Sequence, residues 1–91
     1  MEDLLTSRFF RIGDPKSERL VFPLPAAWWS RPYEYEWARR FCNPRDTALD
    51  AGCGLGHPFK FYLADVCREV HACDLDPRIL SPGAILAEVA R

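Results

Sequence analysis

The second half of the chain alternates short apolar runs with a segment whose apolar residues recur at helical spacing. Residues 47–50 form the first short run and lead into a glycine-rich loop. After Pro58, the apolar side chains fall three and four residues apart, as in an amphipathic helix: Phe59, Tyr62, Leu63 and Val66. A second short run covers residues 70–73. This order predicts one βαβ unit with parallel strands.

Proline residues mark further helical starts. Asp76 precedes Pro77 and is interpreted as the cap of a turn rather than as a ligand. Ser81 and Pro82 begin a helical segment that continues over residues 84–90.

Residues 1–45 differ in composition and are predicted to form an aromatic, helical arm that packs against the rest. They hold five of the eight prolines and all three tryptophans, of which Trp28 and Trp29 are expected in a core or interface. Ser30-Arg31-Pro32 is typical of a helix start. The expected buried face of this helix carries Tyr33, Trp37 and either Phe41 or Cys42. Two further segments are predicted, a short helix over 4–12 and an extended stretch over 19–22.

Length and charge limit the possible classes. Ninety-one residues with 48% hydrophobic and 27% charged side chains indicate one small folded domain. A net charge of −1 argues against a protein that coats nucleic acid or binds membranes through a basic surface. No apolar run approaches the roughly 18 residues that a membrane span needs. Because no signal-like segment is apparent, a cytoplasmic location is expected.

The four cysteines are predicted to be reduced thiols. Their spacings of 11, 14 and 6 residues contain no C-x-x-C pair, and the two histidines add no metal-ligand rhythm. No metal site is expected. A chain this small buries only about 60% of its unfolded surface, so its core needs completion.

The spacing of the glycines distinguishes between two kinds of ligand. Gly52, Gly54 and Gly56 form a G-x-G-x-G pattern between a strand and a helix. The dinucleotide fingerprint is G-x-G-x-x-G, and its third glycine would fall at His57 or, in the shifted frame, at Phe59. The nicotinamide interpretation is therefore disfavoured, and phosphate binding is disfavoured with it.

Acidic residues end both predicted strands. Asp50 ends the first strand and suits a ligand that carries an ammonium group and a sulfonium centre. Asp74 ends the second strand and can accept hydrogen bonds from both hydroxyls of a ribose. Leu75 follows and could cover one face of an adenine.

The segment Ala48-Leu49-Asp50-Ala51-Gly52-Cys53-Gly54-Leu55-Gly56 resembles the first motif of class I S-adenosylmethionine-dependent methyltransferases. The resemblance covers residues 46–80 and extends to the second strand, Val70 to Asp74. It implies a Rossmann-like α/β fold, here incomplete, with the arm 1–45 followed by the first part of the cofactor-binding domain, 46–91.

The same resemblance implies a role for each motif residue. Asp50 would contact the methionine end of S-adenosylmethionine, Asp74 would hold its ribose, and Leu75 would pack on its adenine. The loop beneath the cofactor would be lined by Gly52, Cys53, Gly54 and Gly56. The helix around Arg31–Tyr35 resembles the leading helix that some family members lay over the cofactor.

Two functions follow from these observations. The first is the cofactor-binding portion of a methyltransferase whose methyl acceptor and catalytic base cannot be assigned. It predicts self-association or completion by a further carboxyl-terminal part, because a two-stranded parallel sheet needs cover on both faces. The alternative is a non-catalytic interaction module that keeps the loop as a relic. Cys53 is interpreted as a small residue rather than a nucleophile, since only His57 is a local base.

Overall fold

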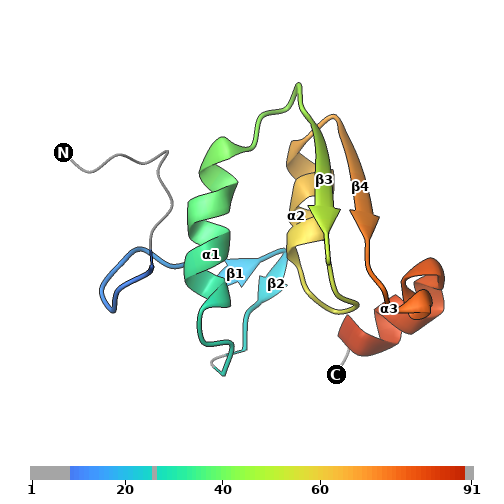
Figure 1. The fold of residues 1–91 in the computed structure, drawn as a ribbon, viewed down its shortest axis with the longest axis horizontal. Coiled ribbons are helices and arrows are strands. Elements are labelled where there is room, and N and C mark those ends of the chain that lie inside the picture. Colours follow the sequence, from blue (N-terminus) through green and yellow to red (C-terminus); the bar gives the residue numbers. More distant parts are fainter. Residues whose placement is uncertain (1–8, 26, 90–91) are drawn as a thin grey trace.

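Two parallel strands form the centre of the structure, which is a computed structural model that describes residues 9–25 and 27–89. Strands β3 (Thr47–Ala51) and β4 (Glu69–Cys73) pair in parallel, with Leu49 opposite His71. Helix α2 (Phe59–Val66) connects them (Figure 1). The predicted βαβ unit is therefore confirmed as part of a small α/β arrangement.

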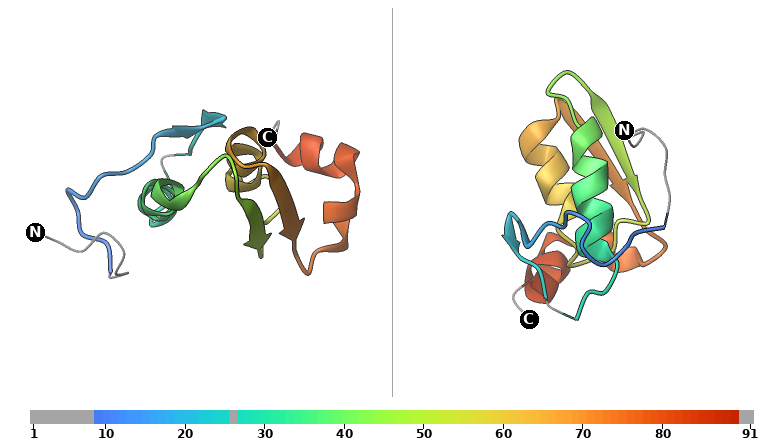
Figure 2. Two further views of the ribbon diagram at one scale, coloured as in Figure 1. Left: turned by 90° about the horizontal axis from the view of Figure 1, so that it is seen from above. Right: turned by 90° about the vertical axis from the view of Figure 1, so that its left-hand side faces the viewer.

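Helix α2 covers one face of these strands, and the other face is bare among the described residues (Figure 2). Ala48, Asp50 and Val70 point toward the helix and are partly buried. Parallel sheets are normally covered on both faces. The bare face here carries six exposed side chains: Thr47, Leu49, Ala51, Glu69, His71 and Cys73.

Helix α1 (Arg31–Ala38) lies beside α2 and joins the arm to the sheet (Figures 1 and 2). Tyr35 is buried, with 6% of its surface exposed, and its ring stacks on Phe59 at a centroid distance of 5.2 Å and an interplanar angle of 5°. This stacking gives the arm and the βαβ unit a shared core.

The predicted buried face of α1 is only partly correct. Trp37 and Phe41, which were expected inside, are 37% and 43% exposed and contact each other at 4.8 Å, whereas the alternative Cys42 is partly buried. Tyr33 is partly buried, but it stacks on Phe10 of the arm at 4.6 Å. Because Tyr35 faces α2, residues two positions away along the helix point elsewhere. The helix continues as a short 3₁₀ turn, η1 (Arg39–Phe41).

The extended stretch of the arm folds back on itself. Strands β1 (Arg19–Leu20) and β2 (Phe22–Pro23) pair antiparallel around Val21, whose φ of +67° is unusual for a β-branched residue. Leu20 is 2% exposed and anchors this hairpin. Of the helix predicted over 4–12, residues 4–8 lie outside the described part, and residues 9–12 are not helical.

The carboxyl-terminal segment confirms the predicted helical starts. The 3₁₀ turn η2 (Pro77–Leu80) is capped by Asp76, whose side chain accepts the Arg78 N–H at 3.0 Å. Helix α3 (Pro82–Val89) follows and lies beyond the carboxyl ends of the strands (Figure 1). None of the helices in the described ranges is both long and apolar enough to cross a membrane. The four cysteines carry free thiols.

Candidate functional site

The glycine-rich loop follows β3. At two of its positions the backbone adopts the left-handed conformation that glycine favours. Gly52 and Gly54 have φ of +68° and +69°. A Cβ at Gly52 would meet nothing within 4 Å, whereas one at Gly54 would lie 2.8 Å from Cε1 of His57 and closer still to Nδ1. Gly54 is therefore needed both for its backbone angle and for the space that the His57 ring occupies.

Two backbone contacts tie this loop to the end of β4. The Cys53 N–H donates to the Cys73 carbonyl at 3.0 Å. The Gly54 N–H donates to Asp74 Oδ2 at 2.8 Å, and Asp74 Oδ1 accepts the Asp76 N–H at 3.0 Å. These bonds, first from Asp76 and then from Gly54, lower the pKa of the Asp74 carboxyl. Each of its oxygens keeps lone-pair capacity for a further donor.

Asp50 alternates along β3 with the exposed Leu49 and Ala51 and is itself partly buried. Burial raises the pKa of its carboxyl, while the positive charges of Lys60 and Arg31 oppose that rise. Asp50 therefore adds negative charge just before the loop, in partial balance with two nearby cations.

Lys60 is a site residue that the sequence pattern did not indicate. It occupies the first turn of α2 and is buried, and its Nζ donates to the Gly54 carbonyl at 2.9 Å and to the His57 carbonyl at 2.7 Å. A lysine in an amphipathic helix is normally assigned to the solvent face, so only the position of the loop carbonyls reveals this contact.

His57 connects the loop to the arm. Its ring lies 4.9 Å from the Trp28 ring, centroid to centroid, and its Nδ1 is buried with no hydrogen-bond partner in the described part of the chain. Burial, and then the positive charges of Arg31 and Lys60, lower the pKa of its imidazole. His57 is therefore neutral near pH 7.

The thiol of Cys53 is not arranged for nucleophilic chemistry. It is 4% exposed, and burial raises its pKa, which disfavours the reactive thiolate. Its Sγ is directed to the Gly54 carbonyl at 3.4 Å. These observations agree with its interpretation as a small packing residue.

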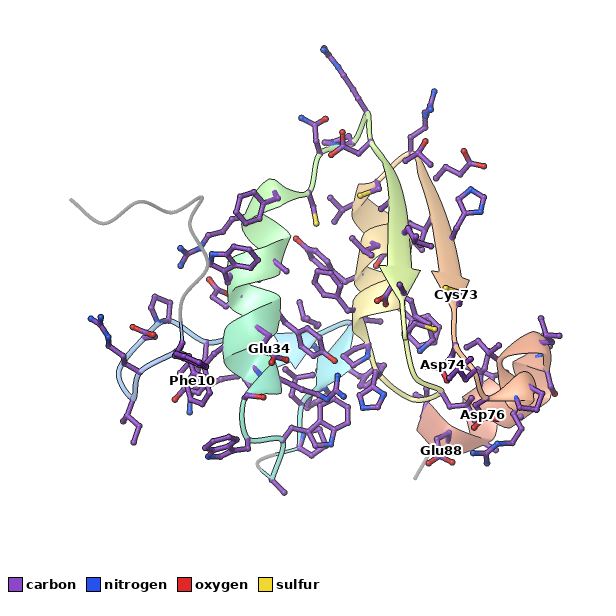
Figure 3. The ribbon with its side chains drawn as sticks, viewed as in Figure 1. Phe10, Glu34, Cys73, Asp74, Asp76 and Glu88 are labelled. Carbon is purple, nitrogen blue, oxygen red and sulfur yellow. The ribbon has the colours of Figure 1, made fainter. Side chains whose placement is uncertain are left out.

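The remaining predicted site residues border the loop in different ways. Leu75 is fully exposed, so one face of a planar ligand could lie on it. Gly56 lies against α3, where an added Cβ would come within 3.1 Å of Glu88 Cγ. Figure 3 shows Asp74, Asp76 and Glu88 gathered at this end of the molecule. Asp76 itself is paired with Arg78 at 2.6 Å, as its role as a cap predicts.

The aromatic part of the arm borders a separate cavity of about 570 Å³ that is half open to solvent. Trp28 reaches both this cavity and His57, whereas Trp29 is 80% exposed. Of the two tryptophans predicted to lie in a core or interface, Trp28 is partly buried, and the exposed Trp29 leaves only the interface open for its side chain. The cavity is lined by Phe10, Ile12, Lys16, Ser17, Glu18, Leu24, Pro25, Trp28, Trp29, Pro32 and Tyr33.

Comparisons with protein-family models, with curated proteins and with solved structures each give no match to this chain. The glycine loop and its neighbours therefore provide the observations from which a function can be inferred.

Proposed function

We propose that this chain is the S-adenosylmethionine-binding portion of a methyltransferase. The observation that carries the proposal is the meeting of a G-x-G-x-G loop and an acidic strand end, where the Gly54 N–H contacts Asp74 at 2.8 Å. Ligands of parallel α/β units bind outside the carboxyl ends of the strands, which is where both features lie.

The residues present fit the chemical groups of this cofactor. Asp74 has lone pairs left for ribose hydroxyls, and the exposed Leu75 can cover an adenine face. Asp50 supplies negative charge for the ammonium and sulfonium groups. The bare backbone of Gly52, with open space where a Cβ would be, permits close approach.

When bound, S-adenosylmethionine supplies an electrophilic methyl group on its sulfonium. The contribution of this part of the protein would be to hold and orient the cofactor, because in-line placement accounts for most of the rate of such a transfer. We assign no catalytic base and no methyl acceptor to the described residues.

Titration calorimetry tests the proposal. S-adenosylhomocysteine, the demethylated product, is expected to bind with micromolar affinity, and NAD⁺ is expected to give no heat because the loop lacks the dinucleotide spacing. Absence of heat from S-adenosylhomocysteine and from S-adenosylmethionine at about 1 mM would contradict the proposal. Equal binding of NAD⁺ would do so as well.

A non-catalytic interaction module is the second candidate, and the exposed apolar side chains favour it. Leu49 on the bare sheet face is 66% exposed, and Leu80 and Leu86 are 86% and 68% exposed. Sedimentation with and without S-adenosylhomocysteine separates the two functions. A stable oligomer that binds no S-adenosyl ligand supports the module, whereas ligand binding supports the first proposal.

A further inference from the structure

Lys60 is the one charged side chain that is buried in the described part of the chain, with 6% of its surface exposed. Lysine is rarely buried unless its ammonium has partners. Its position adds a second cost, because a cation in the first turn of a helix opposes the helix dipole. The ammonium must therefore be compensated by its surroundings.

Two carbonyl oxygens of the glycine loop supply that compensation directly. Lys60 Nζ donates to Gly54 O at 2.9 Å and to His57 O at 2.7 Å. Gly54 is thus held at both of its peptide groups, since its N–H is taken by Asp74 and its carbonyl by Lys60. The left-handed backbone at Gly54 is fixed between a carboxylate and an ammonium.

The charges that face Lys60 come from three other segments. Asp50 on β3 and Asp74 after β4 favour its positive form, Cys53 in the loop does so only as a thiolate, and the ring of Phe61 lies 4.8 Å from the ammonium. The positive charge of Lys60 in turn disfavours the protonated form of His57. Burial lowers the pKa of the Lys60 ammonium below its usual 10.5.

We propose that Lys60 is the positioning residue of the glycine loop: its ammonium draws the Gly54 and His57 carbonyls inward, and the loop thereby presents the ordered backbone to which an S-adenosyl ligand binds. The choice of ligand rests on the proposed function, whereas the ordering of the loop does not. Removal of the ammonium takes the Lys60 donor from the His57 carbonyl, leaves the Gly54 carbonyl with only the weak Cys53 thiol donor, and releases Gly54 from one of its two anchors.

The test compares Lys60→Met with Lys60→Arg and with Lys16→Met, a control at an exposed lysine outside the loop. Amide hydrogen exchange of Gly54 is measured without ligand, and S-adenosylhomocysteine affinity is measured by calorimetry. Because a hydrogen bond to a charged group contributes about 1.5–3 kcal/mol, Lys60→Met is expected to speed exchange and weaken binding at least about tenfold. Lys60→Arg is expected to retain part of the slow Gly54 exchange and part of the affinity. Lys16→Met is expected to change neither the exchange nor the affinity.

A pH titration of the unmodified chain gives a second readout that does not depend on a variant that folds. The ¹³Cε resonance of Lys60 and the amide resonance of Gly54 are expected to titrate together below pH 10.5, and the ligand affinity to fall over the same range. Independent titration of the two resonances would overturn the proposal. So would a Lys60→Met variant with unchanged Gly54 exchange and unchanged affinity.

The two proposals fail in different ways. If the unmodified chain binds no S-adenosyl ligand but Lys60→Met releases Gly54, the proposed function is wrong and the positioning of the loop by Lys60 stands. If the ligand binds equally well to Lys60→Met and Gly54 exchange is also unchanged, the proposed function stands and the role of Lys60 is wrong.

Discussion

The Asp74 carboxylate accepts the Gly54 backbone N–H at 2.8 Å, so the end of β4 holds the loop that follows β3. The contact joins two residues that are 20 positions apart in the sequence. It orders the loop from one side, while Lys60 orders it from the other. The loop is therefore organised by the folded chain before any ligand arrives, which reduces the entropy lost on binding.

Replacement of Asp74 by Ala is expected to abolish binding of S-adenosylhomocysteine, because it removes both the ribose acceptor and the anchor of Gly54. Asp76→Ala is the matched control, since Asp76 caps η2 and pairs with Arg78 instead. The affinity of Asp76→Ala is expected to stay within about threefold of that of the unmodified chain. Calorimetry measures the affinities of both variants. Equal losses in the two variants would show that Asp74 has no special role.

Gly54→Ala is expected to destabilise the fold more than Gly52→Ala. Both positions have φ near +70°, so each substitution carries a backbone cost of about 1–2 kcal/mol. Only the Cβ at residue 54 also meets the His57 ring. Urea unfolding measures the difference, and a double change of Gly54→Ala with His57→Ala should recover part of it. Equal destabilisation by the two single changes would contradict the observed packing.

The free energy of unfolding is expected to fall as the pH is lowered through the range in which His57 takes up a proton. The pKa of this imidazole is lowered from 6.5 in the folded chain, so the unfolded chain binds more protons as the pH falls below 6.5. His57→Phe keeps a ring beside Gly54 and removes the titration. Its free energy of unfolding should exceed that of the unmodified chain more at pH 5 than at pH 8.

The comparison at two pH values cancels the other titrating groups, because both proteins contain them. Asp50 has a raised pKa and acts in the opposite direction, and its contribution is common to the pair. A stability difference that does not change with pH would contradict the burial of the His57 ring.

Tyr35→Ala is expected to destabilise the chain by about 3 kcal/mol, since it removes a buried ring that stacks on Phe59. Trp37→Ala on the exposed part of the same helix should cost less than about 1 kcal/mol. Chemical denaturation of both variants checks whether the arm and the βαβ unit unfold together. A Tyr35→Ala variant as stable as Trp37→Ala would indicate that the arm folds apart from the strands.

The strands, the glycine loop and the helical starts could be predicted because their signals are local. A short apolar run before Gly52 predicts a strand and a turn, and Asp76 before Pro77 predicts a cap; both are found. These patterns depend on backbone geometry within a few residues, which the sequence specifies directly.

The features that escaped prediction depend on contacts between distant segments. The buried side of α1 is set by Phe59 of α2, so helical spacing alone selected the wrong face. The burial of Lys60 depends on two carbonyls of the folded loop. The reversal at Val21 requires a positive φ that a β-branched residue rarely adopts, so no sequence signal indicates it.

The most direct test of the central claim is an amide NMR titration of the unmodified chain with S-adenosylhomocysteine. Shift changes are expected to be concentrated at the loop from Gly52 to Gly56 and at Asp74 and Leu75, with smaller effects elsewhere. No change at about 1 mM ligand would contradict the central claim. So would changes confined to the aromatic cavity around Trp28 and Trp29, since binding there would leave the glycine loop unused.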